Sequence, residues 1–393
     1  MRAPRVLFTS LLALAVASLG LLAPTAGAAP GRPRIIASGF FLEGAKPINV
    51  NGTYTPIVGK FATNSSRSDV IWYAPGPGAE QVWANTADEG FAKSALGQQV
   101  DGNYVPLAGN FSGSPYDDIF WYGAGANADL FWKNVSSSTF DASGITVSGA
   151  YYPFTLNDSL GYDDILWWKP GGASSVWSFT GTGTAHVAHN FTAPAGTPLR
   201  GDFNADGYAD IFWYQAGTGA DSLWLGNGNG VFTKHPQTVN GTFTPLVADF
   251  TPFRGGERDD ILWYRAPGTS VLWESNGDGT WATSPHTLPA GTPVASTGSG
   301  WGVVYVIRQG LPDQVWFKNT DIEAVRAAGA GAATNGQGHG ARAATDYLQD
   351  AGNTEIGTGY TPLVANWEDT IADIFWYKPG SGAEHLFYSS SAK

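Results

Sequence analysis

A short run of almost entirely apolar residues recurs along the chain and is its strongest pattern. In most copies an aspartate opens the run, and β-branched, aliphatic and aromatic residues follow. The copies are Asp69–Tyr73, Asp118–Tyr122, Asp164–Trp168, Asp210–Tyr214, Asp260–Tyr264 and Asp373–Tyr377, with a degraded seventh copy at Val303–Ile307. Successive side chains of a strand point to opposite faces. Because both faces of each run are apolar, the pattern predicts seven strands that are buried on both sides.

Each run lies inside a longer unit that predicts four short strands. A second aromatic residue follows the tryptophan of most runs after a glycine-rich turn, as in Trp72 and Trp83, and this spacing predicts a hairpin. A segment with an early proline precedes each run, as at residues 54–57, and a further segment closes most units, as at residues 232–241. Four strands in a unit of about 45–50 residues are typical of a β-propeller blade.

The two ends of the chain predict that the blades close into a ring. The last unit stops at Lys393, after its third strand, and residues 41–53 resemble the closing segment at residues 232–242. We therefore predict an all-β fold: a seven-bladed β-propeller of four-stranded antiparallel blades, closed by an N-terminal strand. The alternative is a linear array of small sheets, which would leave its terminal faces exposed.

The chain predicts one large domain behind a targeting segment. Residues 1–28 combine two arginines, an apolar run and the small-residue site Ala26–Ala28, which is the layout of a secretory signal peptide. A retained N-terminal anchor is the alternative. Residues 29–393 are predicted to form a single propeller, interrupted by an Ala/Gly-rich insertion at 320–358 with short helices at 324–328 and 343–349.

Composition narrows the environment and the partners. The chain has no cysteine and therefore no disulfide bond. Its formal net charge is −12, so nucleic acid and anionic membranes, which bind clustered Lys and Arg, are poor partners. No second apolar run of about 18 residues follows the N-terminal segment, so no membrane span is expected. Taken with the signal-like N-terminus, these features predict a secreted, extracellular protein that is stabilised by its core, by metal, or by both.

Most tryptophans recur at fixed positions of the repeat, so packing in the core is the first explanation for them. Four tryptophans fall outside the repeat, and the core is also the favoured location for these: Trp168, Trp281, Trp301 and Trp367.

One loop, at residues 201–210, carries candidate metal chemistry. Oxygen-bearing side chains alternate at Asp202, Asn204 and Asp206, and Gly207 permits a sharp turn before Asp210. Ca²⁺ takes about 6–8 oxygen ligands, and this spacing supplies most of them. A solvated acidic turn without metal is the alternative, but crowded carboxylates repel one another unless a cation neutralises them.

The string from Gly201 to Trp213 resembles the FG-GAP, or VCBS-type, repeat of integrin-α-like β-propellers. The resemblance covers residues 29–393 as an architecture, but it covers the calcium loop in the fourth unit alone. It implies a Ca²⁺ site between two blade strands, with these ligands: Asp202, Asn204, Asp206, the Tyr208 carbonyl and Asp210. In the other units the loops lose acidic ligands, and their aspartates are expected to accept hydrogen bonds from turn N–H groups.

Binding is the favoured activity. The chain has no cysteine, no G-x-S-x-G elbow and no H-E-x-x-H helix, and His186 and His189 would point to opposite faces of a strand. Carboxylate pairs such as Asp163–Asp164 recur with the fold, which makes them weak evidence for catalysis. Three functions stay open: a lectin-like carbohydrate-binding module, which the resemblance allows, an extracellular protein-interaction scaffold, and a polysaccharide lyase or hydrolase. The expected partner is a glycan or an extracellular protein; the sequence leaves the oligomeric state open.

Overall fold

The computed structural model describes residues 41–390, with gaps at several loops. The positions outside the description are 1–40, 64, 66, 87–89, 126–127, 159–160, 182, 218, 252–257, 299–300, 312, 318–346, 351–355, 357–358, 368–372, 383 and 391–393. The predicted signal peptide and most of the predicted insertion therefore lie outside the described residues.

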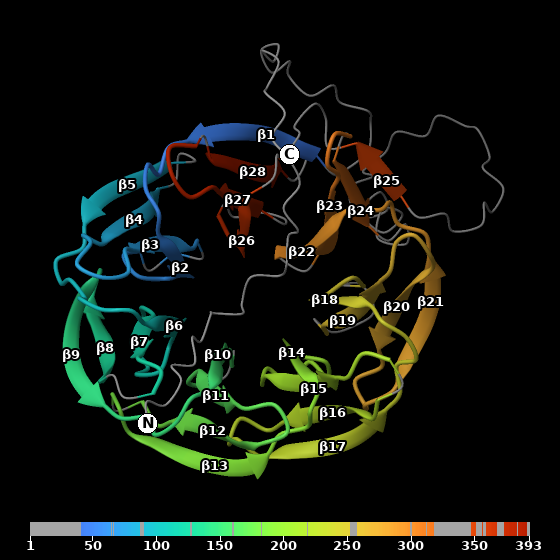
Figure 1. The fold of residues 1–393 in the computed structure, drawn as a ribbon, viewed down its shortest axis with the longest axis horizontal. Coiled ribbons are helices and arrows are strands. Elements are labelled where there is room, and N and C mark those ends of the chain that lie inside the picture. The colour runs from blue at the N-terminus through green and yellow to red at the C-terminus, as the bar shows by residue number, and fades with distance from the viewer. Residues whose placement is uncertain are drawn as a thin grey trace, which may run out of the picture. The chain divides into compact units, whose positions relative to one another are not determined.

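The described residues form seven four-stranded antiparallel sheets that follow one another around a ring (Figure 1). Blade 1 contains β2 (Thr55–Gly59), β3 (Asp69–Tyr73), β4 (Gln81–Thr86) and β5 (Gly90–Ala95). Blade 2 contains β6 (Val105–Gly109), β7 (Asp118–Tyr122), β8 (Asp129–Ser136) and β9 (Thr139–Ile145). Blade 3 contains β10 (Tyr152–Leu156), β11 (Asp164–Trp168), β12 (Ala173–Phe179) and β13 (His186–Thr192).

The remaining blades repeat this order, with the first strand innermost and the fourth outermost. Blade 4 contains β14 (Thr197–Gly201), β15 (Asp210–Tyr214), β16 (Asp221–Gly226) and β17 (Phe232–Gln237). Blade 5 contains β18 (Thr244–Ala248), β19 (Asp260–Tyr264), β20 (Ser270–Ser275) and β21 (Trp281–His286). Blade 6 contains β22 (Thr292–Gly298), β23 (Trp301–Ile307), β24 (Gln314–Phe317) and β25 (Tyr347–Asp350). Blade 7 contains β26 (Thr361–Ala365), β27 (Asp373–Tyr377), β28 (Glu384–Ser390) and β1 (Phe41–Ile48).

The N-terminal strand closes the ring, as predicted. Strand β1 pairs antiparallel with β28 and supplies the outermost strand of blade 7. Gly52 then bridges Gly380, and the same glycine bridge recurs within the ring at Gly76–Gly102, Gly125–Gly149 and Gly217–Gly241. The prediction of a seven-bladed propeller closed by an N-terminal strand is therefore confirmed.

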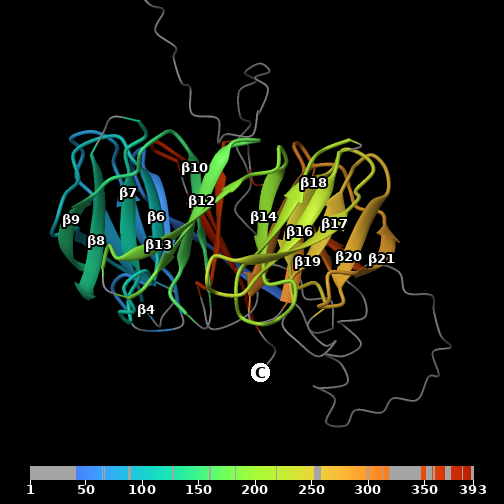
Figure 2. The same ribbon diagram turned by 90° about the horizontal axis from the view of Figure 1, so that it is seen from below.

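The recurring runs form the second strand of each blade and pack blade against blade. In blade 2, Ile119 and Trp121 lie in one cluster with Ile71 and Tyr73 of blade 1. The opposite face of the same strand, with Phe120, lies in a cluster with the run of blade 3. These side chains are fully buried, which confirms that the runs are covered on both faces. The side view shows the strands running between two faces that carry the connecting loops (Figure 2).

The repeated tryptophans meet edge to face inside blades 1 to 5, with ring centroids 5.2 Å apart for Trp72 and Trp83 and 5.1 Å apart for Trp121 and Trp132. Of the tryptophans outside the repeat, Trp367 is buried, while Trp168 and Trp281 are half-buried against core clusters. The side chain of Trp301 lies outside the described residues. The core location is therefore confirmed fully for Trp367 and in part for the other two.

The helix predicted at residues 343–349 is wrong where the structure describes it. Residues Tyr347–Asp350 form strand β25, which pairs with β24 and supplies the fourth strand of blade 6. A short isolated helix is marginal in water, whereas a ladder with an existing strand satisfies the backbone at once. The helix predicted at 324–328 lies outside the described residues. Along the described part of the chain, no helix has the length and apolar character needed to span a membrane.

Candidate functional site

The predicted calcium loop connects β14 to β15 in blade 4, and its side-chain oxygens converge. The N–H of Asp206 donates to Asp202 Oδ1 at 3.2 Å and to Asn204 Oδ1 at 3.1 Å. Asn204 Nδ2 in turn donates to Asp206 Oδ2 at 2.8 Å, and Gly207 N donates to Asp202 Oδ2 at 2.9 Å. The structure thus brings together three of the side chains that sequence analysis proposed as ligands.

The backbone of the loop makes this convergence possible. Ala205 and Gly207 both have positive φ, at 59° and 82°. Gly207 adopts this conformation without steric cost, whereas Ala205 pays some strain for it. The Tyr208 N–H donates to Asp206 Oδ1 at 2.9 Å, so the loop doubles back on its own acidic side chains. These turns let N–H groups of the loop reach the carboxylates of Asp202 and Asp206.

Asp210, the last predicted ligand, has a structural task that other blades share. Its carboxylate accepts the N–H groups of Phe203 at 2.8 Å and Gly226 at 2.7 Å, and so joins the loop to the end of β16. Burial raises the pKa of Asp210 to about 8. A carboxylate oxygen that accepts one N–H keeps a lone pair for a cation, so the ligand assignment for Asp210 stays a prediction.

The corresponding aspartates of other blades confirm the expected use of N–H groups. Asp118 accepts hydrogen bonds from the N–H groups of Ser112 and Asn134, both at 2.8 Å. Asp69 and Asp260 do the same with N–H groups of their own loops and third strands. We call this arrangement the strand clasp, and it explains why the aspartate recurs without a metal loop.

Asp158 of blade 3 also faces the candidate loop, which the sequence did not indicate. Its Oδ1 accepts the N–H of Ala209 at 2.7 Å across the blade boundary. Burial, together with the charges of Asp163, Asp206 and Asp202, raises the pKa of Asp158 to about 6. The two blades are adjacent only in the folded ring, so no spacing in the sequence places Asp158 beside Asp202.

The donor set suits a hard cation. Carboxylate and amide oxygens are the ligands that Ca²⁺ prefers, and soft ligands for a transition metal are missing from the predicted set. Within the described residues no group of three or more His, Cys, Asp or Glu side chains is placed to hold a metal ion. The third converging donor is the amide of Asn204, so calcium here would rely on an amide, a backbone carbonyl and water beside the acids.

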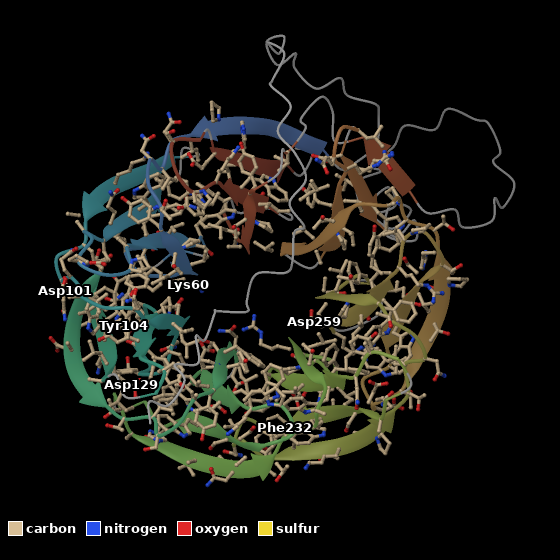
Figure 3. All side chains as sticks on the ribbon, viewed as in Figure 1. Lys60, Asp101, Tyr104, Asp129, Phe232 and Asp259 are labelled. Carbon is tan, nitrogen blue, oxygen red and sulfur yellow. The ribbon has the colours of Figure 1, made fainter. Side chains whose placement is uncertain are left out.

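A second set of aspartates joins neighbouring blades. Asp117, Asp163 and Asp259 each precede a second strand, and each accepts the N–H that follows the innermost strand of the preceding blade. The distances are 2.8 Å from Lys60 N, 2.7 Å from Asn110 N and 2.8 Å from Asp202 N. We call this arrangement the blade clasp. Lys60 and Asp259 mark two of these junctions on the inner side of the ring (Figure 3).

Burial makes the blade clasps electrostatically costly. It raises the pKa of Asp117 and of Asp259 to about 6, and it also raises the pKa of Asp163. Arg200 lies among these acids and donates through Nη1 to the Thr155 carbonyl at 2.7 Å and to Asn157 Oδ1. The surrounding protein lowers the pKa of Arg200, while the charges of Asp163 and Asp259 oppose that shift. Arg200 therefore serves as a local counter-charge.

A third set of acids opens the third strand of most blades. Asp129 accepts the N–H groups of Gly123 at 2.8 Å and Val147 at 2.6 Å, and Asp221 makes the equivalent pair with Gln215 and Val239. Glu384 accepts the N–H of Val50 at 2.9 Å, which ties the N-terminal segment to blade 7. Carboxylates that looked available for acid–base chemistry in the sequence are thus engaged in holding the fold.

Comparisons with known proteins assign no family to this chain. No family model matches this sequence, and no curated protein matches it. A solved structure that resembles it is the crystal structure of BBS1N in complex with ARL6DN, with a TM-score of 0.49 and 11% sequence identity. That alignment covers 90% of this chain and 97% of the other.

Proposed function

We propose that this chain is a secreted, calcium-stabilised β-propeller of FG-GAP or VCBS type that acts as a non-catalytic carbohydrate-binding module. The propeller fold is consistent with a binding or scaffold module. The convergence of Asp202, Asn204 and Asp206 in a single loop carries the calcium part of the proposal. Bound Ca²⁺ would neutralise these acids and tie the loop between β14 and β15.

Local charge supports a cation at this loop. Asp202 and Asp206 lie close together, and Asp158 faces them from blade 3. Burial together with the charge of Asp206 raises the pKa of Asp202. Like charges at short range oppose ionisation, and a divalent cation removes that opposition. The side-chain oxygens of Asp202, Asn204 and Asp206 would hold the ion, with the Tyr208 carbonyl and Asp210 as the further predicted ligands.

The use of the buried acids supports binding over catalysis. A general acid or nucleophile needs a carboxylate that reaches a substrate. Instead, the adjacent acids Asp163 and Asp164 each hold structural hydrogen bonds, to Asn110 N and to the Ser178 hydroxyl respectively. Asp259 and Asp260 are engaged in the same two ways, as a blade clasp and a strand clasp. Residues that support the frame in this way are poor candidates for turnover chemistry.

Secretion is proposed from residues 1–28, which have the layout of a signal peptide. An extracellular setting provides calcium at concentrations that suit a weak structural site, with a dissociation constant of about 10⁻⁴–10⁻³ M. It also exposes the protein to glycans.

A glycan array tests the proposed function. We expect the purified protein to bind a subset of glycans in calcium, and to bind them more weakly in EDTA because the ring loses a stabilising ion. Absence of signal on every glycan in both buffers would overturn the carbohydrate assignment. Release of shortened products from a bound polysaccharide would replace it with a lyase or hydrolase.

A further inference from the structure

The first residue of the innermost strand is threonine in every blade except blades 2 and 3. The first residue of each innermost strand is exposed, and together these seven residues form what we call the axial edge. Five blades place threonine there, whereas blade 2 has Val105 and blade 3 has Tyr152. The full set is Thr55, Val105, Tyr152, Thr197, Thr244, Thr292 and Thr361. Val105 is 43% exposed and Tyr152 is 49% exposed.

Tyr152 is paired with a second unusual aromatic residue. It lies opposite Trp168 in the register of β10 and β11, with ring centroids 5.5 Å apart and planes at 49°. In blades 1, 2, 4, 5 and 7 the residue at the position of Trp168 is a tyrosine. Two large aromatic side chains therefore face each other across this strand pair in blade 3, where blades 1, 2, 4, 5 and 7 pair threonine or valine with tyrosine and blade 6 pairs threonine with isoleucine.

The usual tyrosine makes a contact that Trp168 does not make. The Tyr73 hydroxyl donates to the Gly102 carbonyl at 2.6 Å and accepts the Tyr104 N–H at 3.0 Å, which joins blade 1 to the segment entering blade 2. We call this the tyrosine clasp, and Tyr122, Tyr214, Tyr264 and Tyr377 repeat it. Among the described residues, Trp168 Nε1 has no hydrogen-bond acceptor.

The residue before the innermost strand also varies around the ring. An aromatic residue stands there in blades 1, 2, 3, 5 and 7, as Tyr104 does in blade 2, whereas blades 4 and 6 have Gly196 and Gly291. A Cβ added at Gly196 would meet the Tyr214 carbonyl oxygen of its own blade at 2.7 Å. Trp168 packs instead toward Trp213, with ring centroids 6.4 Å apart, and stays half-buried. The strand pair thus keeps an accessible aromatic surface, formed mainly by Tyr152.

Packing does not account for this surface. Threonine is sufficient at the axial edge in five blades, so the ring closes without an aromatic residue there. A single exposed tyrosine is ordinary on a protein surface. Here two departures from the repeat coincide in one strand pair: Tyr152 at the axial edge and Trp168 opposite it. Both of them enlarge the aromatic surface of that pair.

We propose that Tyr152 and Trp168 form a stacking platform for one neutral pyranose at the junction of blades 3 and 4. The C–H face of a pyranose suits the apolar face of an aromatic ring, and the exposed Thr197 next along the axial edge supplies a hydroxyl for a polar partner.

The chain's net charge of −12 disfavours an acidic sugar at this platform. A protein partner requires a contact area of about 1,000 Å² or more, which a few residues do not provide. This inference rests on the proposed function and assigns it a site.

Saturation-transfer NMR and calorimetry test the platform. The probes are methyl β-galactopyranoside, methyl β-glucopyranoside, methyl α-mannopyranoside and the oligosaccharides that bind best on the array. We expect Tyr152→Ala to weaken binding by about tenfold or more while its melting temperature stays close to that of the parent, because Tyr152 is half-exposed. Trp168→Tyr, which restores the residue of the other blades, is expected to weaken binding several-fold.

The matched control is Tyr162→Ala. Tyr162 is also an exposed tyrosine of blade 3, at 39% exposure, but it lies in the loop at the other end of β10. Unchanged binding by this variant, together with loss in Tyr152→Ala, supports the platform. Equal binding by Tyr152→Ala, Trp168→Tyr and the parent overturns the platform while the proposed function stands. Absence of binding by the parent to every glycan overturns the proposed function and, with it, this site.

Discussion

Aspartate has three structural roles in this propeller, and the position in the blade decides which one applies. At the start of the second strand it forms the strand clasp, and at the preceding position it forms the blade clasp. At the start of the third strand it ties a turn to the segment leaving the blade. Asp202 and Asp206 fall outside all three roles, since their carboxylates accept hydrogen bonds from N–H groups within their own loop. They are therefore the residues on which the calcium proposal depends.

Asp206→Ala tests that proposal at the level of one residue. In calcium we expect a clear fall in melting temperature, because ligand binding at 100-fold excess over the dissociation constant contributes about 2.7 kcal/mol to stability. In EDTA the fall should be small, since the loss of two loop hydrogen bonds is offset by the loss of a repulsive charge. Differential scanning calorimetry in both buffers measures the two shifts.

Asp141→Ala is the control for that experiment, because Asp141 is an exposed aspartate on β9, outside the candidate loop. It should change the melting temperature little in either buffer. If Asp206→Ala lowered the melting temperature equally with calcium and with EDTA, the loop would be a solvated acidic turn and the metal assignment would fail.

At the scale of strands, a glycine and an aspartate occur together across blade boundaries. Three innermost strands end in a glycine that lies at a blade clasp of the next blade: Gly59 with Asp117, Gly109 with Asp163 and Gly201 with Asp259. An added Cβ would lie 2.8 Å from the Asp117 carboxylate at Gly59 and 2.8 Å from the Asp163 carboxylate at Gly109. Glycine is required there by close approach, because the carboxylate must reach the backbone.

Gly109→Ala tests this pairing. The methyl group would displace the Asp163 carboxylate and crowd Phe111, and overpacking of this kind costs about 1–3 kcal/mol. We expect a lower urea midpoint with an unchanged slope in equilibrium unfolding. Gly144→Ala is the matched control, because a Cβ there meets no atom within 4 Å and Gly144 also lies in a strand. An equal loss of stability in both variants would show that the blade clasp has no special need for glycine.

The whole ring buries acids in its blade clasps and strand clasps, and this makes its stability depend on pH. Burial raises the pKa of Asp117 and Asp118 to about 6 and that of Asp164 to about 7. In the unfolded chain these groups titrate near a pKa of about 3.9. Between pH 4 and 7 the folded ring therefore binds more protons than the unfolded chain, so the free energy of unfolding falls as pH rises through that range.

In EDTA we expect a higher melting temperature at pH 5 than at pH 7.5. Asp117→Asn should reduce that difference, since it removes one titrating group while the amide oxygen can still accept the Lys60 N–H. Calcium should narrow the gap by stabilising the ring at pH 7.5, where the loop acids are ionised. A melting temperature that rises from pH 5 to pH 7.5 in EDTA would contradict the assignment of raised pKa values to these buried aspartates.

Much of the architecture could be predicted because it depends on local pattern. The two apolar faces of runs such as Asp118–Tyr122 predicted the buried second strands, and the likeness of residues 41–53 to residues 232–242 predicted closure. The short strand at Tyr347–Asp350 was mistaken for a helix because its pairing partner β24 lies some thirty residues away in the chain. A short weakly patterned segment takes the structure that its neighbours in space allow.

The linear chain therefore determined the number of blades, the faces that each buries and the residues of the candidate calcium loop, because strand period and loop spacing act between residues close in sequence. The fold alone decided which acids meet across blades, placed Asp158 beside the candidate loop, and left Tyr152 exposed opposite Trp168. Those relations join different blades, and distance in the sequence carries no information about them until the ring has closed.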